Sequence, residues 1–165
     1  MKKIWLAGGC FWGVEAYFSQ LKGVSATKVG YGQGQAENPT YQQVCAGTTG
    51  HAEICEVTYD EEELPLPKLL EHFFRIIDPT TLNRQGADRG TQYRTGVYYR
   101  DEAEREVILA FIAQKQADCP RQIVVEVEKY QNFYPAEDYH QNYLQKNPGG
   151  YCHINLGLAG PAERK

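Results

Sequence analysis

Cys10 is the residue whose surroundings in the sequence most favour chemistry. It follows the apolar run 4–7 and the pair Gly8-Gly9, and it precedes a segment with helical periodicity. A sulfur at a helix N-terminus lies near unpaired N–H groups and the positive end of the helix dipole, which lower a thiol pKa from about 8.5 toward 7 or below. The position therefore predicts a nucleophilic thiol. The alternative is a buried cysteine that fills space beside Phe11.

A reacting thiol would need a proton donor and a pocket for its substrate, and an acidic residue and two aromatic rings are candidates for these. Glu53 lies near the start of the alternating segment 52–59. If its face of the strand is buried, desolvation raises the carboxyl pKa and makes Glu53 a proton donor near neutral pH; a solvated strand-end glutamate is the other interpretation. Phe11 and Trp12 would wall a small apolar pocket, or they pack the helix onto the sheet.

The sequence contains five cysteines and a single methionine, the first residue. Only four apolar residues precede Cys10, too few for a secretory signal, so we expect a cytoplasmic protein with reduced thiols. Cys152 lies in a glycine-rich tail, where a thiol suits the resolution of a sulfenic acid formed elsewhere, or is incidental. Neither C-x-x-C nor H-E-x-x-H is present, so we expect no metal site.

Hydrophobic periodicity predicts the elements that must position these residues. We expect strands over 3–7, 24–31, 52–59, 92–100 and 122–130, and helices over 11–21, 67–77, 102–116 and 135–146. This order predicts an α+β fold, a two-layer, ferredoxin-like α/β sandwich with long loops and an irregular C-terminal tail. We expect a single catalytic domain over 1–165, with its core at about 3–146 and the tail at 147–165.

Composition excludes several classes of function. The 165 residues include 17 Lys and Arg against 21 Asp and Glu, a net charge of −4, and no basic run that would bind nucleic acid. The longest apolar run, Val107–Ala113, is far shorter than the roughly 20 residues that span a bilayer. We therefore expect no nucleic-acid or membrane partner, and a monomer.

The segment Gly9–Glu15, GCFWGVE, resembles the signature of the type A peptide methionine sulfoxide reductases, which reduce the S epimer of methionine sulfoxide. Further motifs of that family follow in order, and the resemblance covers roughly residues 3–158. They are GY at 30–31, NPTY at 38–41, TGHAE at 49–53, RQG at 84–86, Asp88, GTQYR at 90–94, FYPAEDYHQ at 133–141, NP at 147–148 and GYC at 150–152.

The resemblance implies a role for each residue of the catalytic site. Cys10 would attack the sulfoxide sulfur, while Glu53, helped by the hydroxyls of Tyr41 and Tyr93, would protonate the oxygen. A neutral sulfoxide is a poor electrophile until its oxygen is protonated, so a buried acid and a thiolate must coexist. The residues implied for substrate binding are Phe11 and Trp12, which would form the slot for the methyl group, and Asp88 in the polar wall.

The resemblance also implies how the thiol is regenerated. Cys152 would attack the sulfenic acid on Cys10, and thioredoxin would reduce the resulting Cys10–Cys152 disulfide. Thiol exchange supplies all the reducing power, so no flavin, metal or nicotinamide is needed at the site. There are two alternatives: Cys119 as the resolving thiol, and a glutathione-like molecule as the reductant. Cys45 and Cys55 match no catalytic position, and we interpret them as structural.

Two other classes of function stay open from the residues alone. One is a different thiol enzyme, either a peroxidase or a Cys-His acyl transferase that uses His51 or His140. The other is a non-enzymatic redox-sensing module in which Cys10 only packs. Acyl transfer requires a histidine base, whereas sulfoxide reduction requires Glu53 as an acid.

Overall fold

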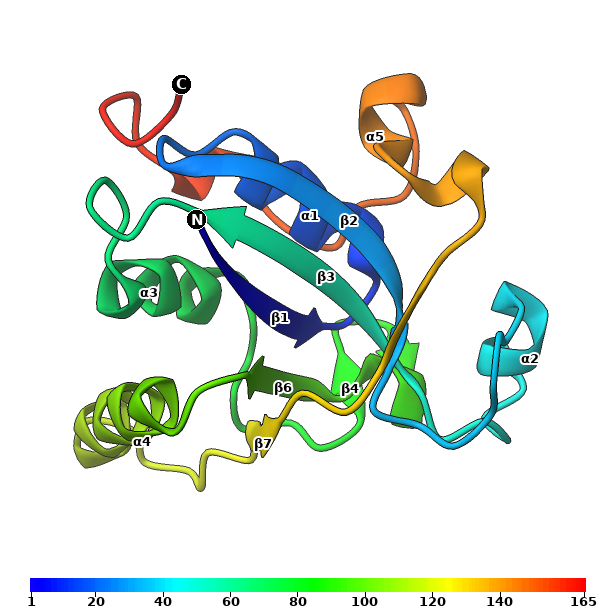
Figure 1. Ribbon diagram of the computed structural model, residues 1–165, viewed down its shortest axis with the longest axis horizontal. Helices are drawn as coiled ribbons and strands as arrows, with labels where there is room; N and C mark the ends of the chain where they lie inside the picture. Colours follow the sequence, from blue (N-terminus) through cyan, green and yellow to red (C-terminus); the bar gives the residue numbers. More distant parts are fainter.

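Strand β1 (Lys2–Gly8) lies at the centre of an antiparallel sheet in the computed structural model, which describes residues 1–165. It pairs with β3 (Ala52–Tyr59) on one side and with β6 (Thr95–Tyr99) on the other. Strand β2 (Val24–Gly32) pairs with β3, so these four strands have the order β6-β1-β3-β2 within a six-stranded sheet (Figure 1). This strand order, on a β-α-β-β-α-β chain, confirms the ferredoxin-like class predicted from the sequence.

Three helices pack against this sheet: α1 (Phe11–Ser19), α3 (Leu66–Ile76) and α4 (Glu102–Ala117) (Figure 1). Their apolar side chains join those of the strands in one buried cluster of 28 residues. On β3, every second residue from Cys55 to Tyr59 belongs to this cluster. Because side chains alternate along a strand, Glu53 also points toward the helix layer.

The boundaries of the long elements agree with local sequence signals. Helix α4 begins with a capping box, in which the backbone N–H of Asp101 donates to Glu104 at 3.1 Å. Helix α3 begins at Leu66 and has Pro67 in its first turn, where the missing N–H of a proline would have no partner in any case. The predicted strand 52–59 is confirmed without change.

The last predicted helix, 135–146, is wrong. The chain instead forms strand β8 (Phe133–Pro135), a 3₁₀ turn at Asp138–His140 and the single turn α5 (Tyr143–Lys146). Strand β8 pairs with the sheet edge at β2, where the partner residues include Gly32. A Cβ on Gly32 would lie 2.6 Å from the carbonyl oxygen of Asn132, so glycine permits the close crossing. Tertiary pairing therefore overrides the local helical pattern.

The regions predicted as long loops contain short elements. Residues 32–51 include α2 (Tyr41–Cys45), and residues 78–91 include a hairpin of β4 (Arg84–Gln85) and β5 (Asp88–Arg89). The predicted strand 122–130 shortens to β7 (Glu126–Lys129), which pairs in parallel with β6. Of these short elements, the β4–β5 hairpin lies against the turn after β1, because a Cβ at Gly9 would lie 2.7 Å from Gln85.

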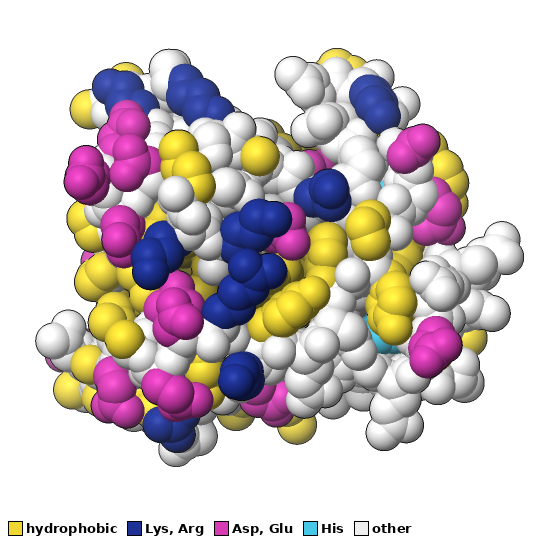
Figure 2. Space-filling view, in the orientation of Figure 1, with side chains coloured by type: hydrophobic (Ala, Val, Ile, Leu, Met, Phe, Trp, Pro, Cys, Tyr) yellow, Lys and Arg dark blue, Asp and Glu magenta, His cyan; other side chains and the backbone are white.

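The C-terminal tail is irregular, as predicted, but it is packed against the body of the protein. Ile154 and Ala159 belong to the main buried cluster, and Arg164 bridges to Leu21. The face of the molecule in Figure 2 carries Lys and Arg side chains interspersed with Asp and Glu. No helix is long and apolar enough to cross a membrane.

Candidate active site

Cys10 lies in the tight turn between β1 and α1, at the N-cap position of the helix. Gly9 before it has φ +84°, in the left-handed region that favours glycine. A Cβ at Gly9 would lie 2.7 Å from the Cβ of Gln85, so the turn also approaches the β4–β5 hairpin closely. The glycine therefore lets the chain place the Cys10 sulfur between the sheet, the helix and the hairpin.

The pKa of Cys10 differs from the sequence expectation. Burial raises the pKa of the thiol above its ordinary value, and the charge of Glu53 raises it further. The backbone N–H of Trp12 acts in the opposite direction, which is the expected effect of a helix N-terminus. The prediction of a lowered Cys10 pKa is wrong for the free protein, because desolvation at this site outweighs the helix terminus.

Glu53 is a buried acid held against the first turn of the same helix. Its side chain is 1% exposed, and Oε1 accepts a hydrogen bond from the backbone N–H of Phe11 at 3.1 Å. Its other oxygen, Oε2, is buried with no hydrogen-bond partner. Burial raises the pKa of Glu53 to about 8, so the carboxyl is mainly protonated at neutral pH. Of the two interpretations of Glu53, the buried acid agrees with the structure and the solvated strand-end glutamate is wrong.

Tyr41, Tyr93 and Asp88 surround these two groups. The charge of Glu53 helps raise the pKa of both tyrosines, and Cys10 also acts on Tyr93. Burial is the largest cause in each case, so both hydroxyls keep their protons at neutral pH. Asp88 in turn helps raise the pKa of Cys10 and of Glu53. The structure thus brings together five residues that lie far apart in the sequence.

Phe11 and Trp12 differ in their environments. Phe11 is 1% exposed and packs its ring against His140, with centroids 5.4 Å apart. Trp12 is half-buried, donates from Nε1 to His140 Nδ1 at 3.0 Å, and stacks on Tyr143 at 3.8 Å. The outer side of Trp12 lines a cavity of about 220 Å³ between α1 and α5, which contains none of the other predicted site residues.

The two histidines considered as bases each make other contacts, and the Nε2 of His140 is buried without a hydrogen-bond partner. His51 accepts from the backbone N–H of Gly34 at Nδ1, and its Nε2 lies 2.6 Å from the carbonyl oxygen of Ala36. The Nδ1 of His140 accepts from Trp12. Neither histidine is hydrogen-bonded to Cys10, so the geometry gives no support to a Cys-His acyl transferase. No three His, Cys, Asp or Glu side chains are grouped to hold a metal ion.

The tail returns to the active site through three consecutive residues. The hydroxyl of Tyr151 donates to Asp88 Oδ2 at 2.8 Å, which raises the pKa of Tyr151 to about 12 together with burial. Cys152 is exposed, and a Cβ at Gly13 would lie 3.2 Å from its sulfur, so the thiol lies against the first turn of α1. His153 follows, with Nε2 3.0 Å from the carbonyl oxygen of Gly8.

The remaining cysteines lie in three different environments. Cys55 is fully buried among apolar side chains, and Cys119 is half-buried beyond the end of α4. Cys45 is exposed at the end of α2, and it influences the pKa of Tyr41. Proximity to Tyr41 was not visible in the sequence, because it depends on the fold of the segment 32–51.

Sequence reasoning missed the residues that support the site. Tyr151 and His153 were given no role, although Tyr151 occurs in a motif of the resemblance, and His140 was considered only as a base for acyl transfer. Glu137 was missed too; its carboxylate accepts from the hydroxyl of Tyr31 and from the backbone N–H of Tyr41. Each of these residues is a polar side chain in a glycine-rich or aromatic segment. Such a pattern indicates that the segment takes part in the site, but it does not show which residue the side chain contacts.

Comparisons with known proteins agree on one family. A family model described as peptide methionine sulfoxide reductase matches residues 2–163. A peptide methionine sulfoxide reductase MsrA of Clostridium botulinum (strain Okra) is 59% identical over 156 residues, 94% of this chain and 99% of the relative. The crystal structure of reduced Mxr1 from Saccharomyces cerevisiae superposes with a TM-score of 0.89 at 40% identity, covering 94% of this chain and 91% of Mxr1. Mxr1 in complex with Trx2 matches with a TM-score of 0.60 at 26% identity, covering 86% and 84%.

Proposed function

The chain belongs to the peptide methionine sulfoxide reductase family, and from this premise we propose how its own residues perform the reaction. The protein is an oxidoreductase that reduces methionine (S)-sulfoxide, free or in proteins, to methionine with thiols, and thioredoxin recycles it. The observation that carries the proposed mechanism is the buried carboxyl of Glu53. It has one oxygen fixed by Phe11 and the other without a partner.

In the proposed first step, the sulfoxide oxygen lies against the free oxygen of Glu53. The carboxyl is protonated because burial raises its pKa to about 8, and it gives its proton to the sulfoxide oxygen. The Cys10 sulfur attacks the substrate sulfur and its proton passes to the Glu53 carboxylate, so a Cys10–substrate S–S bond forms as the S–O bond breaks. The released hydroxyl then bonds to the Cys10 sulfur as the S–S bond breaks, so methionine leaves reduced and Cys10 is oxidised to a sulfenic acid. Glu53 becomes ionised only when its proton has passed to the sulfoxide oxygen. A Glu53 carboxylate and a Cys10 thiolate therefore need not be present together in the free protein.

The surrounding residues complete the proposed site. Tyr41 and Tyr93 keep their protons, so their hydroxyls can donate hydrogen bonds to the developing charge on the oxygen. Phe11 and Trp12 offer apolar surface for the methyl group of the substrate. Asp88 supplies a polar wall, and in the free protein its carboxylate holds the tail through Tyr151.

Cys152 is the proposed resolving thiol. It lies against the first turn of the helix that begins at Cys10, whereas Cys119 lies beyond the end of α4. Attack of Cys152 on the sulfenic acid would form the Cys10–Cys152 disulfide and release water. The relative solved with Trx2 supports thioredoxin as the reductant of this disulfide. Thiol exchange supplies the electrons, so the reaction requires no bound cofactor. A monomer in the cytoplasm stays a prediction.

The test of this function is an assay on both sulfoxide epimers. The purified protein, with thioredoxin, thioredoxin reductase and NADPH, should convert a peptide methionine S-sulfoxide to methionine over many turnovers. The R epimer should react at least about 100-fold more slowly, because its oxygen would point away from Glu53. Equal rates for the two epimers, or no turnover of the S epimer, would contradict the assignment.

Replacing Cys152 with Ser should separate the two halves of the reaction. We expect Cys152→Ser to release about one methionine per protein chain and then to stop with thioredoxin, because Cys10 remains a sulfenic acid. Mass spectrometry after trapping with dimedone should find the adduct on Cys10. Cys119→Ser is the matched control and should turn over like the parent. A Cys10–Cys119 disulfide in the parent protein would instead make Cys119 the resolving thiol.

A further inference from the structure

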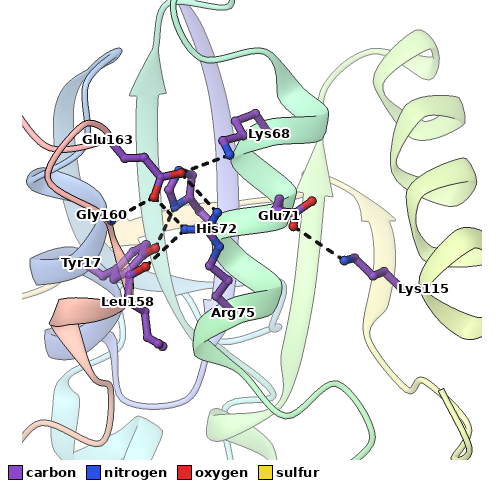
Figure 3. Close-up of polar contacts among 9 residues, drawn as sticks. All are labelled: Tyr17, Lys68, Glu71, His72, Arg75, Lys115, Leu158, Gly160 and Glu163. Atoms are coloured by element: carbon purple, nitrogen blue, oxygen red, sulfur yellow. Dashed lines mark hydrogen bonds and ion pairs between the residues drawn. The ribbon is translucent and has the colours of Figure 1, made fainter. Parts of the chain in front are cut away.

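The last residues of the chain are fastened to α3 by a carboxylate among several cations. Glu163 accepts two hydrogen bonds from the guanidinium of Arg75, at 2.8 and 3.2 Å, and lies 3.1 Å from Lys68 Nζ (Figure 3). The backbone N–H of Gly160 donates to the same carboxylate at 2.9 Å. Arg75 holds the pKa of Glu163 well below its usual range, so this group stays ionised.

The Glu163 carboxylate is also linked, through His72, to α1, the helix that begins after Cys10. His72 is 1% exposed, with Nε2 3.4 Å from Glu163 and Nδ1 2.7 Å from the hydroxyl of Tyr17 on α1 (Figure 3). Burial lowers the pKa of His72, so the ring is neutral at neutral pH. Glu163 therefore joins the chain end to two helices of the core. Backbone hydrogen bonds between the segments 19–22 and 163–165 add to this attachment.

Arg75 connects this cluster to the segment that carries Cys152. Besides Glu163, its Nη1 contacts the carbonyl oxygen of Leu158 at 3.3 Å. Leu158 lies six residues after Cys152. Because the two hydrogen bonds that Arg75 donates to Glu163 fix the guanidinium plane, they also fix the group that holds Leu158. The Gln20 side chain donates to the nearby carbonyl of residue 156 at 2.9 Å.

The upstream end of the same segment is fastened independently. The backbone N–H of Asn142 donates to Glu15 on α1 at 2.7 Å, and Tyr143 stacks on Trp12. Between these two attachments, Cys152 itself is exposed, and its sulfur lies against Gly13 and contacts the carbonyl oxygen of Ile154. The resolving thiol thus lies on a segment attached at both ends and, between them, through Tyr151, His153 and Ile154.

We propose that Glu163 is a positioning residue for the resolving step, acting through Arg75 on the span that carries Cys152. A span held at both ends samples a small volume, which keeps the effective concentration of its thiol near Cys10 high. In that step the Cys152 sulfur attacks the Cys10 sulfenic sulfur, the S–O bond breaks, and the hydroxide leaves as water with the thiol proton. The inference rests on the proposed function, because it requires the sulfenic acid on Cys10.

The test measures the two steps separately in a single turnover. Reduced protein is mixed with one equivalent of S-sulfoxide peptide without thioredoxin and quenched with an alkylating agent. At each time, methionine is quantified by chromatography and the Cys10–Cys152 disulfide by mass spectrometry. Glu163→Gln should slow disulfide formation at least about 5-fold while methionine forms within about 2-fold of the parent rate. Glu71→Gln is the matched control, because Glu71 pairs with Lys115 on the far side of α3 and does not touch the tail (Figure 3).

Each other result has a defined meaning. Unchanged rates for both steps in Glu163→Gln, or equal slowing of both, would overturn the positioning role, since a purely structural role lowers both together. If Glu163→Gln does not fold, Arg75→Lys decides by the same ratio, because it keeps the charge but loses the paired hydrogen bonds. Failure of the parent protein to form methionine would instead overturn the proposed function.

Discussion

Methionine formation should stop when Cys10 is replaced by Ser, with a loss of at least about 10³-fold in the first turnover. A serine hydroxyl has a far higher pKa and a less polarisable oxygen, and it forms no sulfenic acid that Cys152 could resolve. The exchange of sulfur for oxygen hardly changes volume at a site half-buried in the turn after Gly9, so folding should persist. A quenched single-turnover assay of methionine, beside a thermal unfolding curve, measures both.

Cys119→Ser is again the control for loss of a thiol, because Cys119 is half-buried like Cys10 but lies beyond the end of α4. It should retain the parent rate. Persistence of turnover in Cys10→Ser at more than a few per cent of the parent would show that another thiol reduces the sulfoxide. Cys45 would then be the candidate, since it lies beside Tyr41.

Glu53→Gln should lower the rate of methionine formation by about 10²- to 10⁴-fold, the usual contribution of a general acid. The amide oxygen of glutamine can still accept from the backbone N–H of Phe11, so the turn should keep its geometry. The amide has no proton acidic enough to transfer to the sulfoxide oxygen. Stopped assays of methionine in the first turnover isolate this step from thioredoxin recycling.

Glu15→Gln offers a matched control for loss of a buried carboxyl. Glu15 is 2% exposed and burial raises its pKa too, but its oxygens accept hydrogen bonds from Thr27 and from the backbone of Asn142. Its loss should leave the first-turnover rate within about 3-fold of the parent. A Glu53→Gln protein as active as Glu15→Gln would remove Glu53 from the mechanism.

The pH profile gives the same acid a second signature. The Glu53 pKa is raised to about 8, so the protonated form that donates is present below pH 8 and is lost as the pH rises through this value. Deprotonation of Cys10 acts in the opposite direction, because the thiolate fraction grows with pH. The parent rate should therefore rise with pH up to about pH 8 and then level off, because the two effects cancel above the Glu53 pKa, whereas the rate of Glu53→Gln should go on rising. A parent profile that rises without limit would contradict the acid role.

The sequence identified the fold and the members of the site for separate reasons. The alternation along 52–59 predicted the strand and placed Glu53 on the same face as Cys55, Val57 and Tyr59, but it left open whether that face was buried. The pair Gly8-Gly9 predicted the turn before Cys10, because a left-handed residue must be available there. These features depend on neighbours in the chain, and local physics is sufficient to predict them.

The remaining features depend on contacts between distant segments. The pKa of Cys10 follows from burial and from Glu53, which lies 43 residues away, so the helix terminus alone gave the wrong direction. The predicted helix 135–146 is interrupted because its start, Pro135, ends strand β8, which pairs with the glycine-containing edge of β2. The attachment of Glu163 to Arg75 was also invisible, since a charged residue near a chain end usually stays in solvent.

The unpartnered oxygen of Glu53 has a consequence for discrimination between substrate and product. A buried polar atom without a partner carries a free-energy cost of about 1–3 kcal/mol, which a sulfoxide oxygen removes when it binds. The thioether product has no oxygen and restores that cost, so this contact alone disfavours methionine by about 5- to 150-fold. Intact methionines outnumber oxidised ones on most protein surfaces. In the proposed mechanism, the unpartnered Oε2 of Glu53 therefore favours binding of the sulfoxide and disfavours binding of methionine residues that need no repair.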